Sequence, residues 1–231
     1  MDPNERGRVV IGGSFASRTR AARAALMLVA ILIGYAGCHS KSSSGPSGSA
    51  HDLLVTLNAA QNDGRTVRWA SLPIPVFLNG IARADEVNAW AVATGGAVTF
   101  AFVGSPPASG ISFRFGGGND VCGLTSLDYE SDGRITSVDI EVVQAIFRGP
   151  QCQRTVVHET GHAIGFLAHT ADGGLMDPDG GNGVITQEDV AFIQSLYALA
   201  PGTFVGLGER IRVPLGRTGR RSITIVDPVR R

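Results

Sequence analysis

The chain has 231 residues, of which 43% are hydrophobic and 17% charged, and its formal net charge is zero. This length is ample for one globular domain and short for two. The zero total hides an uneven distribution: residues 52–208 hold 7 basic and 16 acidic residues, a balance of −9, whereas residues 209–231 have a balance of +5. An acidic domain has the wrong sign for binding phosphate, so we expect no nucleic-acid partner.

The first 38 residues are predicted to be a preface followed by an export signal. A basic start (Arg18, Arg20 and Arg23) precedes an uncharged apolar run at 24–37, which is too short to span a bilayer comfortably as a mature helix. The run ends in Tyr-Ala-Gly-Cys, which resembles a bacterial lipobox and implies lipidation of Cys38. Ordinary signal cleavage and a retained anchor stay open. We therefore expect an exported protein, either an envelope lipoprotein or a secreted one, which meets the membrane through a lipid anchor or the signal segment.

Composition divides the rest of the chain into three parts. Residues 39–51 are rich in Ser and Gly and are predicted to be a flexible linker. Residues 52–202 are predicted to be the folded domain, and residues 203–231 an Arg-rich tail. The tail could settle on the acidic domain or touch anionic polymers, but we expect it to be solvated, and its strand-like alternation at 222–226 has no assignable role.

Periodicity predicts the elements of the domain. In chain order they are a strand at 74–78, a helix at 82–94, strands at 98–103 and 111–115, a hairpin of 124–129 with 134–142, a helix at about 153–165, and a last helix that begins at the Thr186 cap and ends before 201–202. This order predicts an α+β domain with a mixed sheet backed by two helices.

The most informative segment is His158-Glu159-Thr160-Gly161-His162 with the residues that follow it. Two histidines four positions apart project from the same face of a helix and can bind one zinc ion. Glu159 can then act as general base on a zinc-bound water. Gly165 lets the backbone leave the helix, so that His169 can supply a third nitrogen. Three protein ligands and one water are typical of a catalytic zinc site, because a structural site would close the fourth position.

At these residues the chain resembles the metzincin metallopeptidases, and within them the matrixin-like branch. Met176, in the segment 174–178, resembles the Met-turn below the metal; segments 88–100 and 185–197 resemble other parts of that domain, so the likeness covers about residues 52–200. It implies a twisted mixed sheet with two backing helices and a C-terminal helix below the zinc cleft. It also implies that 124–129 is an edge strand over the zinc helix, where an extended peptide could add as a further strand. An ordinary edge strand, blunted by its own charges, is an equal alternative.

One departure from the family concerns the third ligand. The family has two residues between the glycine and the last histidine, whereas residues 166–168 make three here. His169 can still reach the metal through a wider turn, and we favour it because imidazole suits zinc. The alternative third ligand is Asp172, since a related branch uses an aspartate after the glycine.

Two further sites are expected. Cys122 and Cys152 are most simply a disulfide in an exported protein, with two free buried thiols as the alternative. Asp139 and Glu141 lie on one face of a predicted strand, where the resemblance implies a calcium site and a solvated strand face is the alternative.

The expected function is hydrolysis of peptide bonds in a protein or peptide substrate by a zinc metalloendopeptidase, with Glu159 as general base. Two other functions stay open. One is a non-catalytic zinc-containing binding module of the cell envelope, and the other is a zinc hydrolase of a cell-wall amide.

Overall fold

The computed structural model describes residues 50–116, 121–144, 152, 154–206 and 219–228. All of them belong to one compact unit that comprises residues 43–231. The export signal, Cys38 and nearly all of the predicted linker lie outside the described residues. Within the described residues, no helix combines the length and the hydropathy that crossing a bilayer requires.

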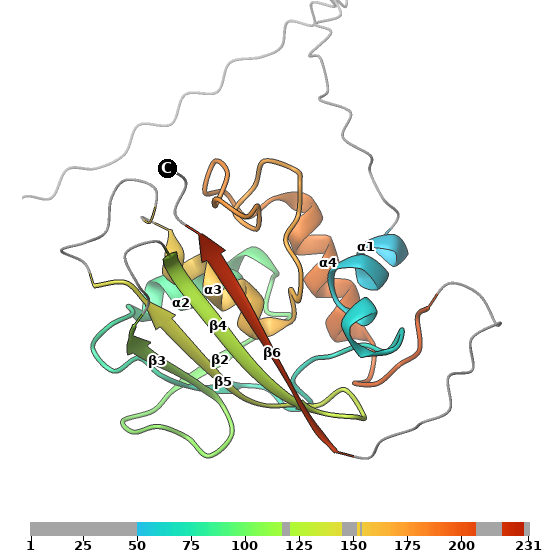
Figure 1. Ribbon diagram of the computed structural model, residues 1–231, viewed down its shortest axis with the longest axis horizontal. Coiled ribbons are helices and arrows are strands. Elements are labelled where there is room, and N and C mark those ends of the chain that lie inside the picture. The colour runs from blue at the N-terminus through green and yellow to red at the C-terminus, as the bar shows by residue number, and fades with distance from the viewer. Residues whose placement is uncertain (1–49, 117–120, 145–151, 153, 207–218, 229–231) are drawn as a thin grey trace, which may run out of the picture. The chain divides into compact units, whose positions relative to one another are not determined.

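A single mixed sheet of six strands forms the centre of the described part of the chain (Figure 1). The strands are β1 Ile74–Phe77, β2 Phe100–Phe102, β3 Ile111–Phe115, β4 Val121–Glu130, β5 Ile135–Val142 and β6 Arg220–Pro228. Their order across the sheet is β2-β1-β3-β5-β4-β6. The first four strands in this order run parallel, and β4 is antiparallel to both of its neighbours. The fold is therefore α+β with a mixed sheet, as predicted.

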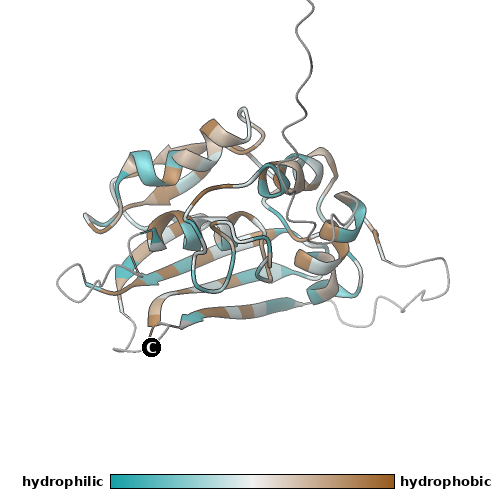
Figure 2. Ribbon diagram, turned by 90° about the horizontal axis from the view of Figure 1, so that it is seen from above, coloured by the Kyte–Doolittle hydropathy of each residue, from teal (hydrophilic) through white to brown (hydrophobic). Residues whose placement is uncertain are grey.

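The helices cover one face of the sheet. They are α1 Ala50–Leu57, the 3-10 helix η1 Ala59–Asn62, α2 Ala84–Ala93, α3 Thr155–Ile164 and α4 Gln187–Ala198. Helix α3 lies on β4 and β5 and packs against α2, while α4 packs against α1. Buried and more exposed residues alternate along β4, and apolar and polar residues alternate along the sheet in Figure 2. One face of the sheet thus forms the core together with the helices.

The structure differs from the sequence-based expectation at both ends of the domain. Helix α1 begins at Ala50, inside the segment predicted to be a linker. The sheet continues beyond the predicted boundary at residue 202, because β6 pairs with β4 along most of its length. The prediction that 124–129 is an edge strand is consequently wrong: this segment lies within β4, between β5 and β6. The segment predicted to be a solvated tail supplies the strand that covers it.

Candidate metal centre

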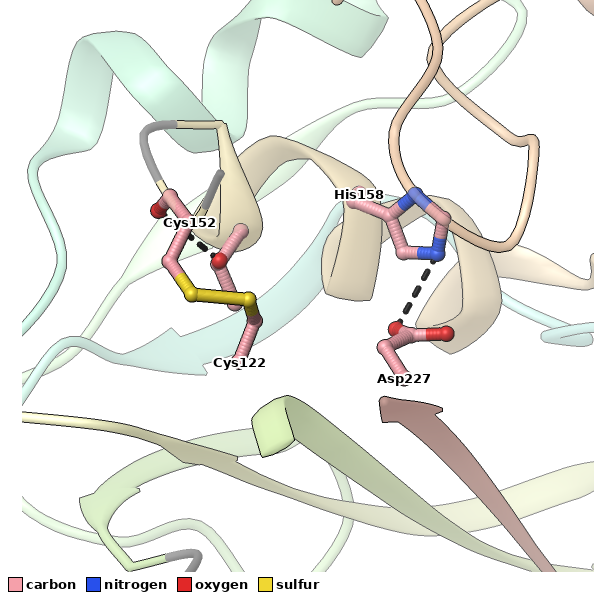
Figure 3. The surroundings of a disulfide bond; sticks show 5 residues. Cys122, Cys152, His158 and Asp227 are labelled. Carbon is pink, nitrogen blue, oxygen red and sulfur yellow. Dashed lines mark hydrogen bonds and ion pairs between the residues drawn. A yellow bond between two sulfur atoms is a disulfide. The ribbon is translucent and has the colours of Figure 1, made fainter. Parts of the chain in front are cut away.

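Helix α3 is buried along its whole length, because it lies between the sheet and α2. Its start is fixed by the Thr155 hydroxyl, which donates to the Cys152 carbonyl over 2.9 Å. Cys152 forms a disulfide with Cys122, with their Cα atoms 5.2 Å apart (Figure 3). The predicted cysteine pair is therefore at disulfide distance. It joins the segment just before α3 to the start of β4.

The two histidines of α3 are oriented by backbone carbonyls. His158 Nδ1 lies 2.5 Å from the Leu175 oxygen, and His162 Nδ1 lies 2.6 Å from the Phe166 oxygen. A carbonyl oxygen only accepts, so Nδ1 carries the hydrogen in each ring. In the neutral rings the two Nε2 atoms, 3.0 Å apart, then present lone pairs to each other. Burial lowers the pKa of His162, which favours this neutral form.

A tightly held turn follows α3 and returns the chain to the same place. Gly165 has φ 132°, and a Cβ there would lie 2.5 Å from Leu196 Cδ2, so no larger residue fits. The Asn58 amide donates to the Gly165 oxygen over 2.8 Å and to the Val67 oxygen over 2.7 Å. The next residue, Phe166, is fully buried. The additional residue of the 166–168 spacing is accommodated in this turn, which leads His169 back to α3.

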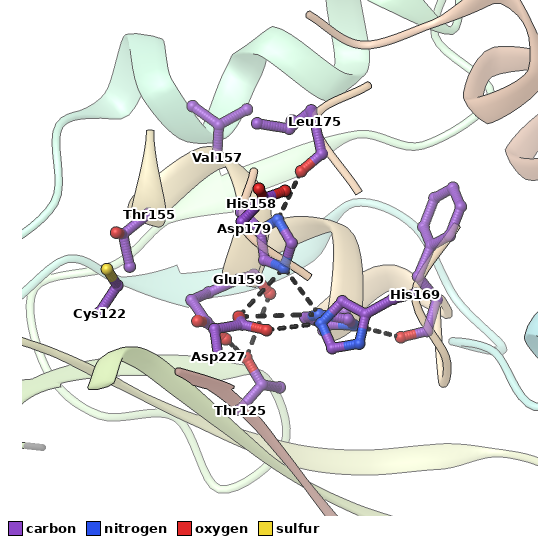
Figure 4. Close-up of polar contacts among 12 residues, drawn as sticks. Cys122, Thr125, Thr155, Val157, His158, Glu159, His169, Leu175, Asp179 and Asp227 are labelled. Atoms are coloured by element: carbon purple, nitrogen blue, oxygen red, sulfur yellow. Dashed lines mark hydrogen bonds and ion pairs between the residues drawn. The ribbon is translucent and has the colours of Figure 1, made fainter. Parts of the chain in front are cut away.

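His169 completes a group of three imidazoles, and Asp227 of β6 joins them (Figure 4). The His169 ring centroid lies 5.5 Å from that of His158 and 4.9 Å from that of His162. Asp227 Oδ1 lies 2.5 Å from His169 Nε2, and Oδ2 lies 3.0 Å from His158 Nε2. One donor atom from each of the four residues lies within 4.8 Å of all the others.

The four donors fit a bound metal ion. Lone pairs facing each other at 3.0 Å repel unless a cation or a proton lies between them. The nitrogen donors of a tetrahedral zinc ion, bound at about 2.0–2.1 Å, lie about 3.3 Å apart, close to this separation. Asp227 Oδ2 is buried and has no hydrogen-bond donor, although it lies against the histidines. A single divalent cation would satisfy all of these atoms at once.

Glu159 lies beside this group on the side of β4. Its Oε2 accepts a hydrogen bond of 2.6 Å from the Thr125 hydroxyl, while Oε1 is buried without a partner. The backbone of β4 approaches closely at Gly123, where a Cβ would lie 2.0 Å from Glu159 Oε1. Burial raises the pKa of Glu159 well above its usual value, and the neighbouring Asp227 raises it further. Burial also acts to raise the pKa of Asp227, but hydrogen bonds with the imidazoles and with Glu159 outweigh this and lower it, which requires a proton or a cation between Asp227 and the facing Nε2 atoms.

The predicted Met-turn methionine packs against α3 at Gly161. Met176 is fully buried. A Cβ on Gly161, which lies between the two histidines of α3, would be 2.4 Å from Met176 Sδ and 2.8 Å from Trp90 Cζ2. Gly161 thus leaves the room that the methionine fills. In this position Met176 supports the helix and supplies none of the four donor atoms.

The remaining predicted site residues lie elsewhere. Asp172, the alternative third ligand, accepts from the Gly174 N–H over 2.9 Å and from the Thr186 hydroxyl over 2.7 Å. It therefore ties the loop before α4 to the start of that helix. Glu141 Oε1 pairs with Arg114 at 2.5 Å, and Asp139 is exposed on the same strand. Within the described residues, the one group of three or more metal-ligating side chains is the histidine–aspartate group, so Asp139 and Glu141 belong to no such group.

Sequence reasoning identified the three histidines and Glu159 but missed Asp227. The available signal was the strand-like alternation before it, which did not reveal the partner strand. Comparisons of the chain with protein-family models, with curated proteins and with solved structures find no match.

Proposed function

We propose that this protein is a zinc-dependent metalloendopeptidase of the metzincin type that hydrolyses peptide bonds outside the cytoplasm. His158, His162 and His169 would hold the metal, and an extended protein or peptide would be the substrate. The metzincin assignment rests on the sequence motif together with the α+β fold. Calcium is not part of the proposed reaction.

The single observation that carries the proposal is the position of Glu159. A buried carboxyl group with one oxygen left without a hydrogen-bond partner costs stability whether it is charged or protonated, because desolvation of that oxygen is not compensated. A metal site that served only to stabilise the fold would have no need for this side chain beside its ligands. A general base for hydrolysis must lie here, within reach of a water at the metal.

The residues divide the reaction between them. When bound, zinc supplies a Lewis acid that polarises the peptide carbonyl and acidifies water. Glu159 Oε1 accepts the proton of the attacking water and then delivers it to the leaving amine. The Thr125 hydroxyl holds Oε2, and thereby fixes the direction of Oε1. The N–H and C=O groups of β4 would bind an extended substrate once β6 no longer occupies them.

Asp227 favours a second candidate function. Four protein ligands are typical of a structural zinc site, and Asp227 brings the number of donors here to four. In this alternative the protein is a non-catalytic metal-containing module, and β6 is a permanent part of it. The alternative leaves the unpartnered Oε1 of Glu159 without a role.

The test compares Glu159→Gln with Glu188→Gln, which changes an exposed glutamate on α4. Each is made in the full chain and again together with Asp227→Ala, which removes the fourth donor. We expect Glu159→Gln to retain a full equivalent of zinc and to lower chelator-sensitive cleavage of casein or gelatin by about 10²–10⁴-fold, the contribution of a general base. Glu188→Gln should leave both unchanged.

The results separate the candidates. Stoichiometric zinc without cleavage of any protein, in every background, would favour the binding module. Chelator-sensitive release of fragments from peptidoglycan alone would favour the cell-wall amide. Cleavage by Glu159→Gln at the rate of the parent would show that the general base is another group.

A further inference from the structure

Strand β6 occupies the position in which a substrate strand would add to β4. It pairs antiparallel with β4 from Val121↔Pro228 to Glu130↔Arg220. Strand addition uses the backbone N–H and C=O groups along the open side of a strand. Those of β4 are taken on one side by β5 and on the other by β6. Figure 1 shows β6, in dark red, alongside β4.

Asp227 lies at the end of β6 and meets His158, His162 and His169, with which it forms the candidate metal group. Its register partner is Gly123, the residue of β4 that lies against Glu159. A shift of register at Cys122 precedes this pair. Asp227 is 5% exposed, and its carboxylate lies between the histidines and Glu159, as Figure 4 shows. The strand therefore fills both the peptide-binding edge and the place where a water and a scissile carbonyl would meet the metal.

The remaining contacts of β6 are mostly polar and exposed. Arg220 pairs with Asp128 at 2.6 Å, and Arg221 pairs with Asp63 at 3.0 Å. The exposed Arg220 pair is worth about 0–1 kcal/mol. Arg221 also donates to Oδ1 of the buried Asn62 over 2.9 Å, which is the stronger of the two arginine contacts. In the described part of β6, Ile225 is the buried apolar side chain, and Ile223 packs partly buried against the core. A strand attached in this way is held by its backbone ladder and by Asp227 rather than by a large apolar interface, so another extended chain can replace it.

We propose that β6 is an intramolecular pseudosubstrate: it fills the peptide-binding edge of β4 in cis and supplies Asp227 as a displaceable fourth donor, so that the folded chain is latent. Its partner surface is the edge of β4, and its competitor is an extended peptide that pairs antiparallel with the same edge. The inference rests on the proposed function, because latency presupposes an active site to block.

The first experiment uses two probes on the full-length, Co²⁺-loaded protein. Acetohydroxamate binds the metal at the position that Asp227 fills, whereas a peptidyl hydroxamate must also pair with the edge of β4. Binding is followed by the visible absorption of Co²⁺, which does not depend on turnover. If the open state makes up less than a tenth of the parent, Asp227→Ala should bind both probes at least about 10-fold more tightly. Val226→Ala, which changes a neighbouring side chain that is 46% exposed, should behave as the parent.

The second experiment distinguishes the effect of the β6 backbone on the edge of β4 from the effect of the Asp227 carboxylate on the metal. Ser126 and Thr224 are register partners with hydroxyl oxygens 3.2 Å apart, so a cysteine pair there can tie β6 to β4. The triple variant combines Asp227→Ala with Ser126→Cys and Thr224→Cys. In its oxidised form it should bind acetohydroxamate but not the peptidyl hydroxamate. Reduction should restore binding of the peptidyl hydroxamate. Asp227→Ala alone, treated with the same reductant, controls for the Cys122–Cys152 disulfide.

Each outcome has one meaning. The proposal is overturned if the parent binds both probes as tightly as Asp227→Ala, if the oxidised tie leaves the peptidyl probe unaffected, or if Asp227→Ala no longer retains Co²⁺. The last result would make Asp227 an integral ligand. Probe binding that follows the expected pattern, without cleavage of any peptide by Asp227→Ala, would refute the proposed hydrolase and leave the occupation of the edge established.

Discussion

The three histidines and the aspartate of the metal group come from parts of the molecule that are held in different ways. The histidines lie on α3 and the turn after it, where carbonyls fix both rings of the helix and the turn is anchored in the core. Asp227 comes from a strand whose outward side chains are exposed and whose flanking ion pairs lie at the surface. The four donor atoms lie close together, but the strand that carries Asp227 is held less firmly than the helix and turn that carry the histidines.

The difference indicates which part of the site is permanent. The three histidines are held by elements that belong to the core. They keep their geometry while the protein is folded, because moving them would open the core. A strand at the edge of a sheet can leave while the rest stays folded, since local opening needs much less free energy than unfolding. The group is therefore better described as a three-histidine frame with an added carboxylate than as a uniform four-ligand site.

The largest expected effect comes from breaking the anchor of the frame with Asn58→Ala. Asn58 is buried, and besides its two donated bonds it accepts the Val67 N–H over 2.7 Å. The substitution leaves these backbone groups unsatisfied, so the free energy of unfolding should fall by about 3–5 kcal/mol. Metal affinity should fall by about 10–100-fold, because the Gly165 turn orients the third histidine. Urea denaturation and competition with a metal chelator measure the two effects.

The control for that experiment is Asn88→Ala, on the partly exposed side of α2. It should leave metal affinity unchanged and stability within about 0.5 kcal/mol. A fall of less than about 1 kcal/mol in the free energy of unfolding of Asn58→Ala would mean that the turn does not depend on Asn58. The histidines and β6 would then differ less in how firmly they are held.

A smaller effect concerns pH, at the start of α4 beside the Met-turn loop. Burial raises the pKa of Asp189 to about 6 from 3.8. A folded-state pKa above the unfolded one stabilises the fold at pH below about 3.8, and this stabilisation is lost as the pH rises through about 6. The free energy of unfolding should therefore fall by on the order of 2–3 kcal/mol between pH 4 and pH 7 from this group alone.

Asp189→Asn should remove that dependence. An amide oxygen can still accept the 2.9 Å bond from the Thr186 N–H, so the cap survives. The variant should be more stable than the parent at pH 7 and equal to it near pH 4, in denaturant titrations at each pH. Glu188→Gln, at an exposed neighbour, should follow the parent. Parallel pH profiles of Asp189→Asn and the parent would argue against the raised pKa.

The smallest effect is expected in β6. Arg220→Ala removes an ion pair of an exposed arginine that is worth at most about 1 kcal/mol. It should raise amide exchange in residues 221–227 by up to about 5-fold and leave exchange in β5 and global unfolding unchanged. Arg134→Ala removes the exposed pair with Asp132, at 2.7 Å, and should not affect β6. Equal acceleration in β5 and β6 would show that the two strands open together, and β6 would then be part of the frame.

The part of the site that local pattern encodes was predictable. The spacing of His158 and His162 defines one helical face, and Gly165 marks where the chain turns back. The hairpin of β4 and β5 and the capped start of α4 are likewise local, and the structure has both. The third histidine lies so near in sequence that the turn alone brings it back. The assignment of these residues to zinc chemistry stays a prediction.

The part that depends on distant pairing was not predictable. Ser126 and Thr224 are 98 positions apart, and no feature of either segment names the other as its partner. Composition was misleading at both ends: the arginines suggested a solvated tail, and the Ser/Gly-rich run before Ala50 hid the start of α1. The apolar residues Leu53, Leu54 and Leu57 have the helical spacing that could have shown this helix.

The alternation of β6 has a consequence for how the metal group could change. Ile223, Ile225 and Asp227 face inward, while Ser222, Thr224 and Val226 face solvent. Asp227 thus reaches the histidines because it occupies one of the inward-facing positions of this two-residue alternation. Loss or gain of one residue between Ile225 and Asp227 would turn the carboxylate outward and point a neighbour at the histidines. A change in length by a single residue, with every ligand retained, would convert a four-donor centre into a three-donor one.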